Sequence, residues 1–144
     1  ICAVAYGYRG DELAGILRSQ GMECEFADPD FAVMMLTPET GNEGLSRLYA
    51  AIESVKQKTA LTAKPPTFAH PQKAMSIRQA TMALCKTVPV EKSAGRVLAS
   101  PSVGCPPAVP IVVSGEVIDE SAIKSFEYYD IKVCSVIKNE RKLM

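Results

Sequence analysis

Hydrophobic positions in the N-terminal part of the chain follow two different periodicities. Continuous apolar runs at residues 2–6 and 31–36 predict short strands, and weak alternation at residues 22–27 predicts another. Apolar residues recur at helical spacing over residues 11–21 and 43–58, which predicts two amphipathic helices. The predicted order is β-α-β-β-α, a small α/β unit.

The periodicity stops at residue 59 and returns at residue 76. The intervening residues 59–75 contain Pro65, Pro66 and Pro71 and are predicted to form an extended linker. We therefore predict two small units, an α/β unit at residues 1–58 and a mixed α+β domain at residues 76–144.

The second unit opens with a helix start signal, since Ser76 is followed three residues later by Gln79, the spacing of a capping box. Asp119 is predicted to cap a second helix. Val88, Pro89 and Val90 are predicted to form a loop. Strands are predicted at residues 96–100, 111–113 and 131–137.

Residues 104–110 contain three prolines, each of which fixes one backbone angle and removes one hydrogen-bond donor. This stretch is therefore predicted to be a rigid extended loop.

Composition narrows the class of protein. The chain has 144 residues, of which 47% are hydrophobic, enough for a core, and equal numbers of acidic and basic residues. Balanced charge argues against a dedicated nucleic-acid binder, and no apolar run approaches the roughly 20 residues that cross a bilayer. The chain begins with Ile1 rather than Met, so we expect a piece of a longer protein.

Charge is distributed unequally along the chain. Residues 1–57 carry four bases and nine acids, whereas residues 58–144 carry twelve bases and seven acids. Opposite charges favour contact between the two units or with a partner subunit. Chance distribution over solvated faces explains the asymmetry equally well.

Five scattered cysteines without a C-x-x-C pair favour a reducing, cytoplasmic location over a disulfide framework or a zinc site. We expect them to be small buried apolar residues. The single histidine, His70, lies in the predicted linker and is expected to be solvated. A Cys105–His70 nucleophilic pair would require the linker to fold back. The cysteines are Cys2, Cys24, Cys85, Cys105 and Cys134.

Two features resemble ligand sites but have ordinary explanations. Gly7 and Gly10 follow a predicted strand and precede a helix, where a phosphate could bind. Asp11 and Glu12 would repel a phosphate there, which favours an ordinary turn. The carboxylate pairs at residues 28–30 and 119–120 are explained by turns and helix caps.

Three stretches of the second unit resemble the C-terminal domain of the bacterial ornithine/lysine/arginine decarboxylases. They are Gly95-Arg96-Val97, Cys105-Pro106-Pro107-Ala108-Val109-Pro110 and Ser114-Gly115-Glu116. Residues 75–80 are similar to the capped helix that opens this domain, and residues 7–28 are similar to the family's small domain. Many family members have Tyr, Gly and Pro where this chain has Cys105, Ala108 and Ser114.

The resemblance implies pyridoxal-phosphate enzymes with an aspartate-aminotransferase-like core. Residues 1–58 would be the small domain and residues 76–144 the C-terminal decarboxylase domain. The family's cofactor lysine follows a histidine in the large domain, but His70 is followed by Pro71. We therefore expect no catalytic, cofactor-binding or metal-binding residue in this chain, and no activity of the chain alone.

The resemblance also implies partners and a rim of the active site. The expected partners are the missing large domain, a second subunit in a homo-oligomer and a basic amino acid, with lysine as the specific substrate suggested, but no nucleic acid or membrane. Candidate rim residues are Cys105, Pro106, Pro107, Ala108 and Glu116. Equally, the prolines could only shape a corner between strands. Glu116 could contact a substrate amine, although a turn-stabilising or solvated role is favoured.

A different class of function stays open. The chain could be a stand-alone cytosolic protein-interaction module that presents its Pro-rich loop to a partner and carries out no catalysis.

Overall fold

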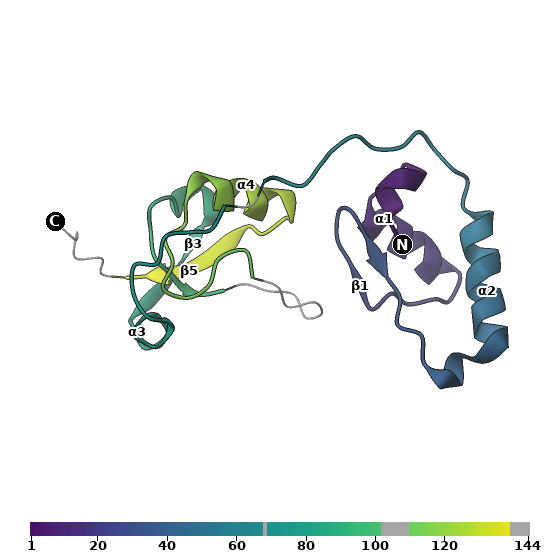
Figure 1. Ribbon diagram of the computed structural model, residues 1–144, viewed down its shortest axis with the longest axis horizontal. Coiled ribbons are helices and arrows are strands. Elements are labelled where there is room, and N and C mark those ends of the chain that lie inside the picture. The colour runs from purple at the N-terminus through teal and green to yellow at the C-terminus, as the bar shows by residue number, and fades with distance from the viewer. Residues whose placement is uncertain (68, 102–109, 139–144) are drawn as a thin grey trace. The chain divides into compact units, whose positions relative to one another are not determined.

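The computed structural model describes residues 1–67, 69–101 and 110–138 (Figure 1). The chain divides into two compact units, Ile1–Lys64 and Pro65–Met144. Both mix helices with a small antiparallel sheet, as expected for a mixed α+β protein. Among the described residues, no helix combines the length and apolar character that crossing a membrane requires.

The first unit consists of short strands and 3-10 turns around two longer helices (Figure 1). Helix α1 buries Leu13, Ala14 and Leu17 on one face, as its spacing predicts. The elements are η1 (Ala3–Tyr6), α1 (Gly10–Ser19), β1 (Phe26–Ala27), β2 (Ala32–Val33), η2 (Pro38–Thr40) and α2 (Gly41–Ser54).

The predicted first strand is wrong, because Ala3–Tyr6 forms a 3-10 helix. Gly7 ends this helix with a φ of 82°, and its N–H donates to the Val4 carbonyl at 3.1 Å. A Cβ at Gly7 would lie 2.5 Å from the Thr59 carbonyl oxygen, so a larger residue would clash with the segment that follows α2. A tight turn and a close crossing therefore replace the strand that the apolar run predicts.

The predicted strand at residues 31–36 is largely wrong as well. Only Ala32–Val33 forms a strand, antiparallel to Phe26–Ala27, and Phe31 makes an isolated antiparallel bridge to Cys2. Met35 and Leu36 are 63% and 53% exposed, so the apolar run continues beyond its pairing partner onto the surface. A six-residue strand needs a partner of similar length, and β1 has two residues.

The core of the first unit is made largely of small and medium-sized side chains. Helix α2 carries the predicted apolar stripe, yet Ala51 is its only buried residue. The buried cluster consists of Ala3, Tyr8, Leu13, Leu17, Ala32 and Ala51.

The second unit is built on a three-stranded antiparallel sheet in the order β3-β5-β4. The central strand β5 pairs Ile137 with Cys85 of β3, and Val136 with Leu98 of β4. The elements are α3 (Ile77–Thr81), β3 (Cys85–Pro89), η3 (Val90–Lys92), β4 (Leu98–Ser100), α4 (Glu120–Tyr128) and β5 (Val133–Ile137).

Two predictions for this unit are wrong. Val88 and Pro89, predicted as loop, end strand β3, where proline is tolerated because β3 lies at the sheet edge. Residues 111–113 form no strand, although Val112 is buried.

Both predicted helix caps are confirmed. The Ser76 hydroxyl accepts from the Gln79 N–H at 3.2 Å, and the Gln79 side chain accepts from the Ser76 N–H at 3.0 Å. The Asp119 carboxylate accepts from the Ala122 N–H at 2.8 Å. These short-range signals act within one turn of chain, which is why the sequence alone identifies them.

The main core of the second unit is larger, and helix α4 contributes Phe126 to it. A second, smaller buried cluster in this unit consists of Ala80, Val97, Ala99 and Ile137. Cys134 is buried as expected, whereas the expectation is wrong for Cys2 and Cys85, which are exposed. The main cluster consists of Val90, Leu98, Val112, Ile118, Ala122, Phe126, Cys134 and Val136.

Candidate functional site

The Ser114–Glu116 turn is the best-defined part of the region that resembles the decarboxylases. Gly115 has a φ of 91°, a conformation that glycine adopts readily and other residues do not. Its carbonyl accepts from the N–H groups of Ala74 and Met75 at 2.9 and 3.1 Å. A Cβ at Gly115 would lie 2.5 Å from the Met75 carbonyl oxygen. Glycine is therefore required here both by backbone conformation and by close approach.

Glu116 holds this turn closed. Its carboxylate Oε2 accepts from the Val113 N–H at 2.9 Å, and its own N–H donates to the Val113 carbonyl at 3.2 Å. Its side chain is half-buried. A turn-stabilising role for Glu116 is thus seen directly, while contact with a substrate amine stays a prediction.

The turn is joined to both neighbouring segments by backbone hydrogen bonds. The Gly115 N–H donates to the Leu98 carbonyl at 2.8 Å, and the Leu98 N–H donates to the Glu116 carbonyl at 2.9 Å. On the other side, the Val117 N–H donates to the Gln72 carbonyl at 2.9 Å. The turn thereby joins β4 to the segment that precedes α3.

The predicted rim residues Cys105, Pro106, Pro107 and Ala108 lie outside the described residues. The described chain reaches this stretch from β4, where Ser100 pairs with Ser135. It continues beyond the stretch into Val112, which is 2% exposed and part of the main core. Both flanks of the predicted rim are therefore anchored in the second unit.

Arg96 has a role that the sequence did not indicate. Its guanidinium Nη2 donates to the Ile137 carbonyl at 2.8 Å, at the end of β5. The preceding Gly95 has a φ of 71°, and its N–H donates to the Ile118 carbonyl at 2.8 Å. The Gly-Arg-Val motif thus stabilises the sheet and the turn beside it.

The Gly7–Gly10 turn is occupied by the protein's own groups. The Gly10 N–H donates to the Pro29 carbonyl at 3.2 Å, and the Glu12 N–H donates to Asp11 Oδ1 at 2.9 Å. The Arg9 side chain bonds the Asp11 carboxylate and lowers its pKa, so Asp11 is charged at neutral pH. This arrangement supports the ordinary turn rather than a phosphate site.

The carboxylates of the Asp28–Asp30 turn and of the Asp119 cap also bond backbone groups. Asp28 Oδ1 accepts from the N–H groups of Asp30 and Phe31 at 2.8 and 2.7 Å.

His70 is exposed, and the Cys105–His70 pair cannot be placed because Cys105 lies outside the described residues. Over residues 1–67, 69–101 and 110–138, no three His, Cys, Asp or Glu side chains converge as metal ligands.

Two partly or fully buried thiols are poorly suited to nucleophilic chemistry. Burial raises the pKa of the Cys24 thiol and also that of the Cys134 thiol. A raised pKa disfavours the thiolate, which is the reactive form. Cys24 instead lies against Met34, with 3.2 Å between the two sulfur atoms.

Comparison with known proteins assigns the class. The family model for the Orn/Lys/Arg decarboxylase C-terminal domain matches residues 54–138, which is more than half of the chain. The chain therefore belongs to the Orn/Lys/Arg decarboxylase family, as the motifs predicted. No curated protein sequence matches it.

The fold is similar to that of a solved decarboxylase. The structure of E. coli constitutive lysine decarboxylase matches with a TM-score of 0.54 at 13% sequence identity. The match covers 90% of this chain and 28% of the E. coli chain, so this chain spans well under a third of that protein. At this identity the likeness concerns the fold, and it extends across most of both units.

Decarboxylases of this family are pyridoxal-phosphate-dependent, and nothing among the described residues shows where this chain would bind that cofactor. It requires a lysine beside an enclosed pocket that also holds a phosphate. Lys58 and Lys132 instead form surface ion pairs with Glu12 and Asp130. The pocket in the first unit is lined by no lysine.

Proposed function

We propose that this chain is the C-terminal part of a pyridoxal-phosphate-dependent decarboxylase that releases CO2 from lysine, ornithine or arginine. The observation that carries the proposal is the family match over residues 54–138. The similarity in fold to a lysine decarboxylase over 90% of the chain supports it, and favours lysine among the three substrates. The lysine that holds the cofactor would lie in another part of the enzyme.

In this proposal the chain supplies part of the active-site rim and of the subunit contact. Cys105, Pro106, Pro107 and Ala108 would form the rim segment, because prolines lose little entropy when a loop is ordered at a binding site. Its flanks are anchored by Ser100 in the sheet and Val112 in the core. The partners would be the large cofactor domain and a second subunit, and the scattered cysteines favour a cytoplasmic enzyme.

Glu116 would act first as a positioning residue. Its Oε2 atom accepts from the Val113 N–H, and Val113 follows the rim segment by five residues in the sequence. No described group bonds its second carboxylate oxygen, so that oxygen is free to attract the distal ammonium of a basic amino acid.

The test combines the chain with the remaining large domain and measures CO2 release from the three amino acids. We expect no turnover by the chain alone and turnover when both parts are present, fastest with lysine. Turnover by the chain alone, or none by the combination with any of the three, would contradict the proposal. An inactive combination in which both parts are folded and associated would favour the protein-interaction module instead.

The role of Glu116 is resolved by two substitutions in the assembled enzyme. Glu116→Gln keeps an oxygen that accepts from Val113 but removes the charge, whereas Glu116→Ala removes both. A raised KM for lysine in both variants would indicate substrate contact. An unchanged KM in Glu116→Gln, with a lower Tm in Glu116→Ala, would indicate that Glu116 acts only on the turn.

A further inference from the structure

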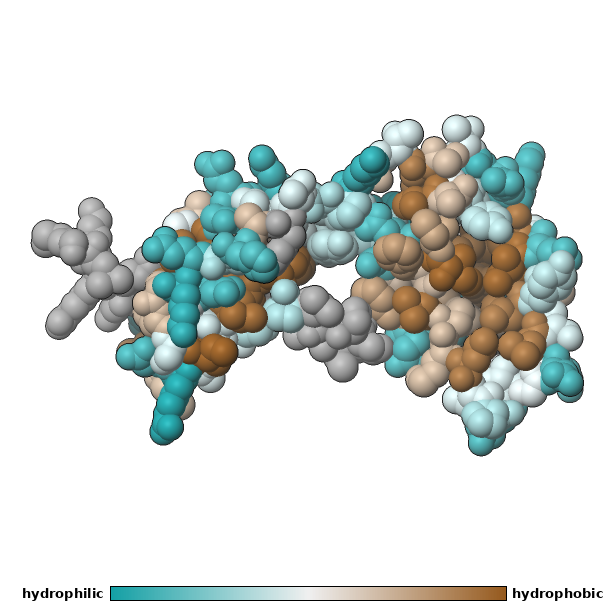
Figure 2. All heavy atoms as spheres, in the orientation of Figure 1, coloured by the Kyte–Doolittle hydropathy of each residue, from teal (hydrophilic) through white to brown (hydrophobic). Residues whose placement is uncertain are grey.

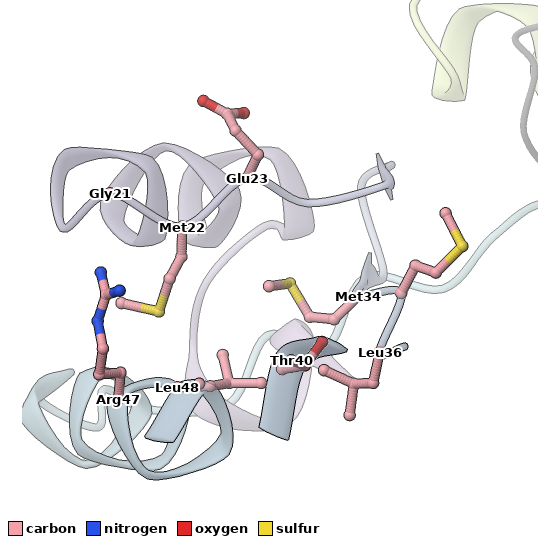
Figure 3. Close-up of a pocket in the computed structure, with 10 residues that line it drawn as sticks. Gly21, Met22, Glu23, Met34, Leu36, Thr40, Arg47 and Leu48 are labelled. Carbon is pink, nitrogen blue, oxygen red and sulfur yellow. The ribbon is translucent and has the colours of Figure 1, made fainter. Parts of the chain in front are cut away.

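The first unit contains an open pocket of about 170 Å³ that none of the motifs above explains (Figure 3). Its walls come from the segment after α1, the segment after β2 and the first turns of α2. The pocket lies outside residues 54–138, the part of the chain that matches the decarboxylase family. Membership of the decarboxylase family therefore does not explain this pocket.

Half of the residues that line the pocket have flexible apolar side chains, three methionines and two leucines. Figure 3 shows Met22, Met34 and Leu48 extending into the space between α1 and α2, with Leu36 at one end. Methionine is unbranched and polarizable, and it adapts to ligands of different shape. Such walls favour an aliphatic group rather than a strongly hydrated one.

One cationic group lies at the opposite end from Leu36. The guanidinium of Arg47 lies beside Gly21, where Nη2 is 3.8 Å from the position that a Cβ would take (Figure 3). Residues 1–64, all of them described, offer Arg47 no ion pair. Arg47 therefore has its charge available for an anion.

The acidic residue at the pocket does not cancel this charge. Glu23 points away from the pocket in Figure 3, and its carboxylate bonds the Arg18 guanidinium at 2.9 and 3.0 Å. The pocket is thus an open, partly apolar depression, with the exposed guanidinium of Arg47 at one end and no ion pair to it. Charge complementarity indicates an anionic ligand with an apolar tail.

We propose that this pocket binds a small aliphatic carboxylate, with its carboxylate on Arg47 and its chain against Met22, Met34 and Leu48. An apolar cavity of about 150 Å³ accommodates benzene, so the volume suits a chain of roughly six carbons. A carboxylate fits better than a phosphate, because a single guanidinium can pair both carboxylate oxygens but would leave much of a phosphate unsatisfied. This proposal is independent of the proposed decarboxylase function.

NMR shifts of the methionine methyl groups test the proposal, because the methionines of the second unit serve as internal controls. The full chain is labelled with ¹³C at the methionine methyl groups and titrated with hexanoate, hexylamine and 1-hexanol. Saturable shifts are expected for Met22, Met34 and Met35 with hexanoate, weaker ones with hexanol and none with hexylamine. Met75 and Met82, in the second unit, should not shift. Equal response to hexanoate and hexylamine, or equal shifts at Met75 and Met82, would overturn the proposal.

The Arg47→Gln variant tests the anchoring charge. It is expected to raise the Kd for hexanoate about tenfold, equivalent to about 1.4 kcal/mol, and to leave the binding of hexanol unchanged. Arg78→Gln, which removes another exposed helical arginine, is the matched control and should have no effect. An unchanged hexanoate Kd in Arg47→Gln would show that the proposal is wrong.

A second copy of the chain is the competing occupant. If the resonances of Met22 and Met34 move when the ligand-free chain is diluted, the pocket is covered by self-association and the carboxylate proposal fails. Resonances that stay fixed on dilution and shift with hexanoate support it.

Discussion

Helices α2 and α4 are both amphipathic, yet they bury their apolar faces to different extents. Helix α4 packs Ala122 and Phe126 into a continuous core, and its Asp119 cap fixes where it begins. Helix α2 is longer but buries only Ala51, while Leu45 and Tyr49 are 45% and 64% exposed. Figure 2 shows apolar residues gathered on the surface of the first unit.

The difference follows from the sheet that each unit contains. In the second unit a three-stranded sheet offers Leu98, Cys134 and Val136 as a surface on which α4 can pack. In the first unit the sheet has two strands of two residues each, too small to cover a long helix. An apolar stripe therefore predicts a helix, but the extent of its burial depends on what the rest of the unit supplies.

The largest expected effect comes from truncating the same residue type in both units. Leu98, 1% exposed, lies in the main core, whereas Leu45 lies on the surface of α2. Leu98→Ala should lower the free energy of unfolding by about 2–5 kcal/mol, because it leaves a cavity. Leu45→Ala should cost less than about 1 kcal/mol. Urea unfolding of both variants, followed by circular dichroism, makes the comparison, and equal losses would show that α2 is buried after all.

The next prediction compares Gly115 with Gly95, a second glycine that has a positive φ but no neighbouring atoms close to its Cβ position. Gly115→Ala should lower the free energy of unfolding by about 2–3 kcal/mol, because it combines a positive φ with a clash on Met75. Gly95 also has a positive φ, yet nothing lies within 4 Å of its Cβ position. Gly95→Ala should therefore cost about 1 kcal/mol. Thermal unfolding distinguishes the two variants. Similar Tm values would mean that the close approach of Gly115 to Met75 does not add to the loss of stability.

The Asp119 cap provides a smaller, pH-dependent effect. The Ala122 N–H and the Ser121 hydroxyl lower the pKa of Asp119 from its ordinary value of 3.8 in the folded chain. A depressed folded pKa means that the charged cap stabilises the fold above the unfolded pKa and that this contribution is lost as pH falls through the folded pKa. Asp119→Ala should cost about 1 kcal/mol at pH 7.

Asp119→Asn separates charge from hydrogen bonding at the same cap, because an asparagine oxygen also accepts from Ala122. Urea unfolding between pH 2 and pH 7 should show a weaker acid dependence in this variant than in the wild-type chain. An identical pH dependence would mean that Asp119 does not contribute to it.

The smallest predicted effect is stabilising and lies in the first unit. Gly15 is an exposed position in α1, and nothing lies within 4 Å of its Cβ position. Gly15→Ala should raise the free energy of unfolding by about 0.5–1 kcal/mol, because alanine has the higher helix propensity. A loss of stability on urea unfolding would show that the exposed face of α1 meets a surface that the first unit alone does not contain.

Much of the secondary structure could be predicted where one turn of chain contains the signal. The Ser76–Gln79 box, the Asp119 cap, the stripe of α1 and the strand at β5 were all identified from local spacing. The family could also be predicted, because its motifs in the second unit are short and contiguous.

Strand pairing could not be predicted in the same way. Residues 111–113 are as apolar as a strand, but the Val113 N–H is taken by the Glu116 carboxylate instead of a neighbouring strand. Conversely, β3 contains Lys86 and Pro89 and does not look like a strand, yet β5 supplies its partner. The pairing of a strand is decided by a segment far away in sequence.

In the candidate site, too, local signals could be predicted and contacts between distant segments could not. The sequence identified Gly115 and Glu116 as important through resemblance, but only the structure shows that they join β4 to the segment before α3. The Arg47 pocket left no signal in the sequence, because its walls come from three separate segments.

The sequence by itself determined where the capped helices α3 and α4 begin, which family the chain belongs to and that it forms two units of mixed α+β structure. Tertiary structure alone decided which apolar residues are buried, which runs become strands and where a charged side chain meets an apolar pocket. The physical reason is that caps and periodicity act through neighbours in sequence, whereas burial and pairing depend on partners that the fold brings from a distance.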